Sequence, residues 1–432
     1  MKEEKIMLQK LQEKFSYFTK RFSNSLNKTE QRFLKESCYG IISSQSCIVR
    51  RTAQSLGEKI ASKKTQERLI YHLDKSDLNN RLSQTLLQKQ SGKLKQDSLI
   101  IVDPSDIVKK YAEKMEGISK VRDGNDGKWK SGYDALDIVG VNQEGNDISI
   151  IPMYSQLHSK VIDVDTMKNT LFDRIVDIIV YSNNQGVFVF DRGFDDRKVI
   201  KELHAHEASY IIRMKNNRDV YFHDKKQNID ELARSTKLRY RFKLPDEATI
   251  SAGMCPIEIP LNSHPVKKPT LTKAVLVVAK IKSNRKDSSI RSGLFYFLCK
   301  TNRDELPKRE IVRFVLDAYR LRWKIEEVHR QVKTDYGWER IQLQTYCRLQ
   351  NMNTVLWIAI SFLYSLDRWK YQLSKVFSHI MTEKKKLIEL ECFIYYRLAN
   401  VLRYCFNRIS LYRKITYHKC KSEFLQLRVS WF

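Results

Sequence analysis

Two short, mostly apolar runs constrain the fold of this chain more than any other feature of its sequence. They span residues 98–102 (SLIIV) and 187–190 (VFVF), and each is followed directly by an aspartate. Runs without alternating polar residues are typical of strands that are buried on both faces of a sheet. Other predicted strands and helices alternate around them, so the sequence predicts an α/β core. These elements are strands at 133–141, 147–154 and 210–214 and helices at 166–181 and 195–204.

Changes in predicted secondary structure and composition divide the chain into five regions. Residues 1–96 are predicted to be a helical DNA-binding domain, and residues 97–215 are the first part of the α/β core. Residues 216–292 are predicted to be a β-rich insertion. The core resumes at 293–366, and 367–432 is a helical, aromatic and basic region. The expected insertion strands are at 238–244, 257–261 and 274–281, and the resumed core begins with a strand at 293–299 and a long helix at 308–334.

Charge points to a nucleic-acid partner. The 432 residues include 78 Lys+Arg and 50 Asp+Glu, which gives a net charge of +28. Because 42% of the residues are hydrophobic, the chain is not a disordered basic tail. A globular protein with this excess of positive charge is expected to bind a polyanion.

The N-terminal region leaves two interpretations of DNA binding open. Two amphipathic stretches, 29–39 and 45–56, lie on either side of a predicted break at 40–44. A helix-turn-helix reader fits this pattern, and so does any basic helical bundle.

Membrane and secreted classes do not fit the sequence. The longest apolar stretch, 354–366, is shorter than the roughly 20 residues that a bilayer-spanning helix needs. The first residues carry acidic side chains and no apolar segment typical of a signal peptide. The eight cysteines form no C-x-x-C pair, which predicts reduced thiols in a cytoplasmic protein without a zinc site.

The two aspartates that follow the apolar runs, Asp103 and Asp191, are candidate metal ligands. Polar groups at the carboxyl ends of neighbouring strands meet at one edge of an α/β sheet, and paired carboxylates suit Mg²⁺ or Mn²⁺. An aspartate after a strand is also a common turn or cap residue, and this alternative stays open from the pattern alone.

The predicted helix at 308–334 carries a polar stripe. At about 100° per residue, Tyr319, Arg322, Glu326 and Lys333 share one narrow face, and His329 lies beside it. Glu326 is close to the border of the apolar face, from which it can point towards the strand ends. The alternative is a solvated face on which Arg322 and Glu326 form an i,i+4 ion pair.

The spacing Tyr319-x-x-Arg322-x-x-x-Glu326-x-x-x-x-x-x-Lys333 matches in full the Y-R-E-K signature of bacterial insertion-sequence DDE transposases. Residues 189–193 (VFDRG) resemble the block around the second acid of that family. Residues 101–106 (IVDPSD), followed by 114–117 (KMEG), are similar to the block around its first acid.

The resemblance implies a fold and a reaction. The implied fold is a ribonuclease-H-like core with a β-rich insertion between the second Asp and the Glu. Asp103, Asp191 and Glu326 would be the catalytic residues and the ligands of two Mg²⁺ ions, for which Mn²⁺ would substitute. Asp106 and Glu327 are the neighbouring alternatives to the first and third acid. Tyr319, Arg322, Lys333, His329 and Arg192 would contact DNA.

The resemblance also implies partners and a location. The expected function is metal-dependent cleavage and strand transfer at insertion-sequence ends, by a homodimer that joins two ends and a target DNA in the bacterial nucleoid. Two rival functions remain: a catalytically silent DNA-binding protein, and a structure-specific nuclease that cuts without joining.

Overall fold

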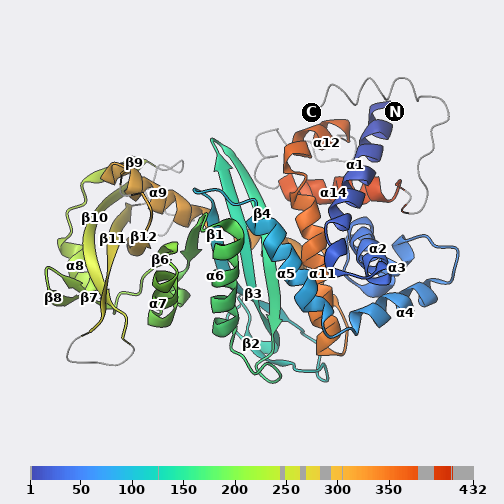
Figure 1. Cartoon of the computed structure of the whole chain (residues 1–432), viewed down its shortest axis with the longest axis horizontal. Helices are drawn as coiled ribbons and strands as arrows, with labels where there is room; N and C mark the ends of the chain where they lie inside the picture. The colour runs from blue at the N-terminus through green and yellow to red at the C-terminus, as the bar shows by residue number, and fades with distance from the viewer. Residues whose placement is uncertain are drawn as a thin grey trace. The chain divides into compact units, whose positions relative to one another are not determined.

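The computed structural model describes residues 2–124, 126–243, 249–262, 269–282, 293–303, 305–377, 394–409 and 411 (Figure 1). The chain forms two compact units. One is Ser83–Arg330, and the other combines Met1–Leu82 with Gln331–Phe432. Parts of the predicted C-terminal helical region lie outside the described residues, as does the last residue of the strand predicted at 238–244.

A large mixed sheet forms the centre of the unit Ser83–Arg330 (Figure 1). Its strands follow the order β4, β3, β1, β5, β6, β12, β11, β10, β7, β8, while β2 also pairs with β3 and β9 with β10. The pairs β1–β5 and β5–β6 are parallel, and the other pairs are antiparallel. The prediction of an α/β core is therefore confirmed as a mixed α/β fold. The strands are β1 Leu99–Val108, β2 Ser119–Arg122, β3 Trp129–Glu144, β4 Asp147–His158, β5 Val187–Phe190, β6 Ser209–Arg213, β7 Asp219–Phe222, β8 Lys225–Asn228, β9 Tyr240–Lys243, β10 Thr249–Pro260, β11 Leu271–Lys282 and β12 Gly293–Lys300.

The sequence analysis predicted that this strand ends at Asp103, but β1 continues beyond it. Its parallel pairing with β5 stops at Val102, but its antiparallel pairing with β3 continues to Val108. Pro104 fits this position because, among the described residues, no strand pairs with β1 on the β5 side beyond Val102. A strand edge of this kind tolerates a missing N–H. Asp103 therefore lies within β1, at the point where the parallel part of the sheet ends.

Helices α6 (Met167–Ser182) and α7 (Arg197–Ala205) pack side by side against the sheet (Figure 1). Both helices begin at a capping side chain: Thr166 accepts a hydrogen bond from the Asn169 amide, and Asp196 accepts one from the Lys198 amide. Their apolar faces join one core cluster with β1, β5 and β6. The helices predicted at 166–181 and 195–204 are confirmed, with small shifts at their ends.

The region predicted to be an insertion, 216–292, extends the same sheet in its described residues. Its longest strands, β10 and β11, pair along their whole length, and β12 then pairs with both β11 and β6. The strands predicted at 257–261 and 274–281 are confirmed as parts of β10 and β11. A short helix, α8 (Ile229–Ser235), completes the described part of the insertion.

The other unit is helical. Its helices are α1 Lys2–Lys20, α2 Lys28–Ser44, α3 Val49–Ser55, α4 Ser62–Leu73, α11 Tyr346–Tyr364, α12 Lys370–Val376 and α14 Ile394–Phe406, and α5 (Leu78–Ser91) begins in this unit and continues into the other. The buried helix α11 packs against α2, α4 and α14.

The predicted break at 40–44 was wrong. Helix α2 continues through Gly40 to Ser44, and its C-cap residue Gln45 has a left-handed backbone (φ 50°). Glycine is needed at position 40 for close packing, since a Cβ atom there would lie 2.5 Å from the Thr52 methyl group of α3. The two amphipathic stretches are thus α2 and α3 with a later turn between them.

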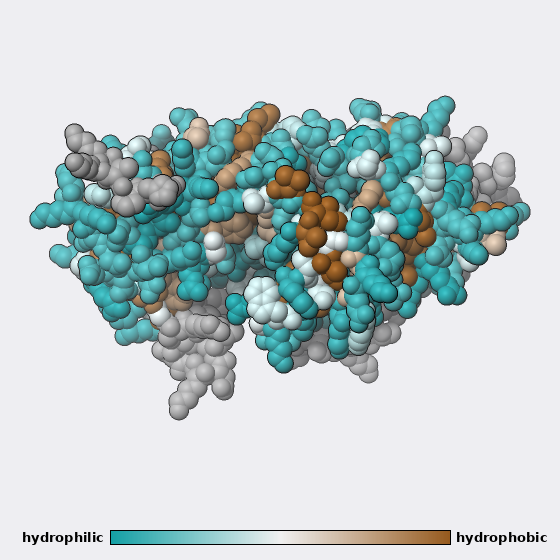
Figure 2. Space-filling model, turned by 90° about the horizontal axis from the view of Figure 1, so that it is seen from below, coloured by the Kyte–Doolittle hydropathy of each residue, from teal (hydrophilic) through white to brown (hydrophobic). Residues whose placement is uncertain are grey.

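The surface is mostly hydrophilic in the view of Figure 2. Among the described helices, none combines the length and apolar character needed to cross a membrane.

Candidate active site

Three side chains from two elements form a compact cluster in the unit Ser83–Arg330. Asp103 comes from β1, and Glu326 and His329 come from α10 (Lys324–Arg330). Each offers a ligand atom, and these atoms all lie within 4.8 Å of one another. Helix α10 packs on β1 and β3, which brings the two carboxylates together.

Asp137 is a fourth member of this site that the sequence analysis missed. It lies on β3 directly opposite Asp103 and is only 3% exposed. Its Oδ2 atom is 3.0 Å from His329 Nε2, while the other ring nitrogen, Nδ1, is 3.6 Å from Glu326 Oε2. Asp137 stands in the middle of a long strand, where no sequence signal separates it from other strand aspartates.

The pKa of His329 is set by opposing effects. Burial would lower it, but hydrogen bonding to Asp137 and Glu326 and the charge of Asp103 outweigh burial and raise it to about 9. In the absence of metal the imidazole therefore carries a positive charge at neutral pH and links two carboxylates.

Arg322 supplies a second cation at the site. Its Nη1 atom donates a hydrogen bond to Asp103 Oδ2 at 3.2 Å. Burial nevertheless raises the pKa of Asp103 to about 6, with Glu326 and Asp191 adding to the increase and Arg322 and His329 opposing it. The fold thus holds this carboxylate where its charge is disfavoured, which is common at functional sites.

Tyr319 lies next to Arg322 and also contacts residues of strands β12 and β6. Its ring packs on Phe297 with centroids 4.8 Å apart, and its hydroxyl accepts a long hydrogen bond of 3.5 Å from Arg213 Nη1. The Arg322 guanidinium lies 5.8 Å from the Tyr319 ring centroid. Two arginines and one tyrosine therefore form a cationic, hydrogen-bonding surface beside the carboxylates.

Asp191 directly follows β5 and caps the turn after it. Its Oδ1 atom accepts a hydrogen bond of 2.6 Å from the Gly193 amide and so caps a short 3₁₀ turn at Arg192–Phe194. It is close enough to Asp103 and Arg322 to influence the pKa of both. It is not part of the compact cluster, and Arg192 beside it is exposed.

The two alternative acids point elsewhere. Asp106 lies three residues after Asp103, on the opposite face of β1 by strand alternation, and accepts a hydrogen bond from the Gly124 amide. Glu327 pairs with Lys324 at 2.5 Å within α10.

The long helix predicted at 308–334 was wrong. Helix α9 (Lys308–Leu321) ends just before Arg322 and Trp323, where i+3 hydrogen bonds replace the regular pattern, and α10 begins at Lys324. A π-helical turn, Gln331–Asp335, follows and contains Lys333. Because Lys333 lies in this π-helical turn, a regular helical face does not connect it to Glu326. A uniform 3.6-residue period cannot reveal such breaks, which often occur at functional sites.

The donor set fits a divalent cation. Asp103 and Glu326 provide the hard oxygen atoms that Mg²⁺ and Mn²⁺ prefer, and His329 provides a nitrogen atom. A cation between these groups would also offset the cost of keeping the Asp103 carboxylate buried and charged.

The arrangement defines an enzyme of the α/β class whose acids converge beside the internal strand β1 in a strongly basic chain. Residues 95–364 match the family described as the transposase DDE domain, and the chain belongs to this family. It is therefore a DDE transposase, an enzyme that acts on DNA. No curated protein matches the chain. Among solved structures it is similar to a piggyBac transposase synaptic complex with hairpin DNA, with a TM-score of 0.40 and 10% identity, over 92% of this chain and 76% of that one.

Proposed function

We propose that this transposase cleaves DNA strands at the ends of a bacterial insertion sequence and transfers the ends to a target by a cut-and-paste route. The observation that carries the proposal is the convergence of Asp103 and Glu326 with His329 inside the matched DDE domain. Asp191, at the end of the adjacent strand, is the proposed third acid. Bound Mg²⁺ or Mn²⁺ would activate the attacking oxygen and stabilise the leaving oxygen.

The protein side chains have separate proposed tasks. Asp103, Asp191 and Glu326 would hold the metal ions. His329, which the sequence analysis assigned to DNA contact, is buried beside Asp137 and Glu326, and its proposed task is to orient Glu326. Arg322 and Tyr319 bind the phosphates next to the scissile bond, since they form the cationic surface beside the carboxylates. Lys333 binds a phosphate one or two nucleotides from the scissile bond, and the exposed Arg192 contacts the DNA backbone.

The strand order supports a ribonuclease-H-like core. Strands β4, β3 and β1 form an antiparallel meander, and β5 and β6 continue it in parallel after helices α6 and α7. We assign residues 97–215 and 293–366 to this core, 216–292 to the insertion and 1–96 to end recognition, with 367–432 as a C-terminal helical region. The active assembly is a homodimer on paired ends.

The direct test is incubation of the full chain with its own element's end DNA, a target plasmid and Mg²⁺. We expect nicking at the element end followed by joining of the new 3′-OH end to the plasmid. Asp191→Asn is expected to abolish both products while end binding stays within about threefold, because binding is distributed over many phosphate contacts. A variant that cuts normally would leave Asp191 with only its capping role, and cutting without joining would identify a nuclease.

Lys333→Ala is expected to slow cleavage about a hundredfold with little loss of DNA affinity. A phosphate contact that aligns the scissile bond affects rate strongly, because a misplacement of about 1 Å can cost this factor. Single-turnover cleavage at saturating protein measures the effect. Lys308→Ala, which removes an exposed lysine at the start of α9, is the matched control and should cleave at the wild-type rate. If Lys333→Ala cleaved DNA as fast as Lys308→Ala, Lys333 would have no more effect on cleavage than an ordinary surface residue.

A further inference from the structure

A β-hairpin outside the acidic cluster presents cations and an aromatic ring on one face. Strand β2 pairs with the first residues of β3 so that Arg122 lies opposite Trp129 and Lys120 opposite Ser131. Directly opposed residues share a face of an antiparallel pair, and residues two apart do as well. Lys120, Arg122 and Trp129 are therefore on the same face, and all three are exposed, the tryptophan at 66%.

The charges of this face are available to a ligand. The two acids of the hairpin, Asp123 and Asp126, both pair with Lys130, which projects from the other face. Within the part of the chain that the structure describes, no carboxylate pairs with Lys120 or Arg122. The Arg122 Nε atom donates a hydrogen bond to the Gly127 carbonyl, which holds its side chain along the hairpin. Lys160 also donates a hydrogen bond to the Lys120 carbonyl, but its charge is paired with Asp134 at 2.6 Å, so Lys120 and Arg122 are the cations of this face.

The hairpin is rigidly connected to the catalytic strands. Strand β3 runs without a register shift from Trp129 to Asp137, which lies opposite Asp103. Because Trp129 and Asp137 are eight residues apart, an even number, they face the same side of the sheet. Their separation along the strand is about 26 Å at roughly 3.3 Å per residue. This span equals about seven or eight base pairs of B-form DNA at about 3.4 Å per pair.

Close packing at the base of the hairpin supports this rigidity. A Cβ atom at Gly132 would lie 2.3 Å from the Ile107 carbonyl oxygen, so β1 and β3 approach closely there. The Gly124 amide is also hydrogen bonded to Asp106 of β1. The hairpin is thereby fixed to the strand that carries Asp103.

We infer that the face formed by Lys120, Arg122 and Trp129 binds duplex DNA about seven or eight base pairs from the scissile bond. This inference rests on the proposed function, since that function places the scissile phosphate at Asp103. The two cations match backbone phosphates in charge, and a two-stranded ribbon has the width that the major groove admits. Trp129, opposite Arg122 on the neighbouring strand, supplies an apolar ring that packs on sugars or base edges beside the phosphate contacts. The hairpin thereby sets the distance along the duplex between its own contact and the scissile bond, and it holds the duplex in line with the acidic cluster.

The first experiment measures binding without catalysis. Anisotropy of a fluorescein-labelled 30-base-pair duplex of random sequence is followed in EDTA over a series of salt concentrations, with the full chain. The double variant Lys120→Ser/Arg122→Ser is expected to lower the slope of log affinity against log salt by about 2, because each lost phosphate contact removes about 1. Trp129→Ala is expected to weaken binding several-fold without a change in slope, and Trp129→Phe to restore most of it.

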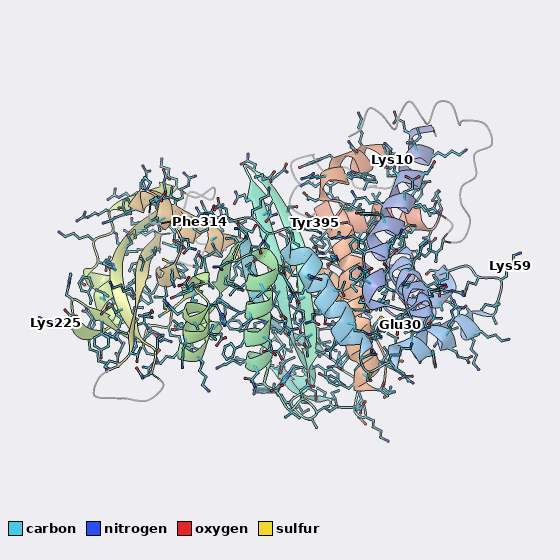
Figure 3. All side chains as sticks on the ribbon, in the orientation of Figure 1. Lys10, Glu30, Lys59, Lys225, Phe314 and Tyr395 are labelled. Carbon is cyan, nitrogen blue, oxygen red and sulfur yellow. The ribbon has the colours of Figure 1, made fainter. Side chains whose placement is uncertain are left out.

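The matched control is a hairpin of the same sheet. Lys225 is an exposed lysine on β8 in the β7–β8 hairpin (Figure 3), and Lys225→Ser is expected to leave slope and affinity close to wild type. Melting temperatures of all variants should be equal within about 2 °C, since the substituted side chains are exposed. An unchanged slope in the double variant, with the fold intact, overturns the inference.

The second experiment locates the contact. Single 5-iodouracil substitutions are placed along a duplex that carries the terminal repeat of the encoding element, and ultraviolet cross-linking is scored. A cross-link that peaks seven or eight base pairs from the cleavage position and disappears in Trp129→Ala supports the inference. A peak elsewhere overturns it. Because the anisotropy experiment needs no cleavage, a chain that binds through the hairpin but never cuts would refute the proposed function alone.

Discussion

Asp103→Asn is expected to reduce the single-turnover rate of strand cleavage at least about a thousandfold. Asparagine keeps the size of the side chain but removes the charge that holds a divalent cation, and such an ion contributes several kcal/mol of transition-state stabilisation. DNA affinity should change by less than about threefold, since Asp103 is 9% exposed within β1. The measurement is cleavage of the element's end DNA at saturating protein, in Mg²⁺ and again in Mn²⁺.

The same substitution is expected to leave the metal-free protein at least as stable as wild type. Burial raises the pKa of Asp103 to about 6, so the fold disfavours its charged form above pH 6. A raised carboxyl pKa means that stability falls as pH rises from about 4 to about 6, and asparagine removes this loss. We expect a gain of about 1–3 kcal/mol at pH 7 in EDTA, measured by urea unfolding. Asp106→Asn is the matched control, because it makes the same change on the opposite face of β1 and should retain cleavage.

A gain in stability together with a loss of activity would show that the fold is strained at this position in favour of function. If Asp103→Asn instead cleaved at the wild-type rate, the first acid would have been misassigned.

The sequence was sufficient to predict the elements that hold the site. The continuous apolar runs at 98–102 and 187–190 form buried strands, because both faces of β1 and β5 are covered. A short continuous apolar run is typical of such a strand. The predicted starts of α6 and α7 fall within two residues of the observed ones, which follow the caps Thr166 and Asp196. The alternation of these elements then predicted the α/β core.

Other features depend on contacts that no local pattern contains. Asp103 was expected at a strand end, but pairing with β3 extends β1 to Val108. The breaks on either side of α10 arise in a segment whose apolar period continues through them, from Leu321 to Val332. Asp137 joins the site only because β3 lies beside β1 and α10 crosses both strands. Each of these facts is set by long-range packing.

Glu30→Gln is expected to cost about 3 kcal/mol of the free energy of unfolding. Glu30 is 3% exposed and lies at the start of α2, where it forms a capping box with Asn27 (Figure 3). Its two oxygens accept hydrogen bonds of 2.9 Å from the two terminal nitrogens of Arg81, and Lys75 Nζ is 3.1 Å away. Replacing the charge would leave two cations without their shared partner, and breaking a buried pair in this way costs about 3–5 kcal/mol.

The pH dependence of this effect has a definite sign. Hydrogen bonding to Arg81 lowers the pKa of Glu30 from 4.5 to about 2, against the opposing effect of burial and with help from Asn27 and Lys75. A lowered carboxyl pKa stabilises the fold fully above about pH 4.5, and this contribution is lost as the pH falls towards 2. Urea unfolding of wild type and Glu30→Gln should therefore differ most at pH 7 and converge near pH 2. Glu67→Gln, at an exposed site on α4, should stay within about 0.5 kcal/mol of wild type at every pH. If the two variants were equally stable at pH 7, the Glu30–Arg81 pair would contribute no more to the helical unit than a surface charge does.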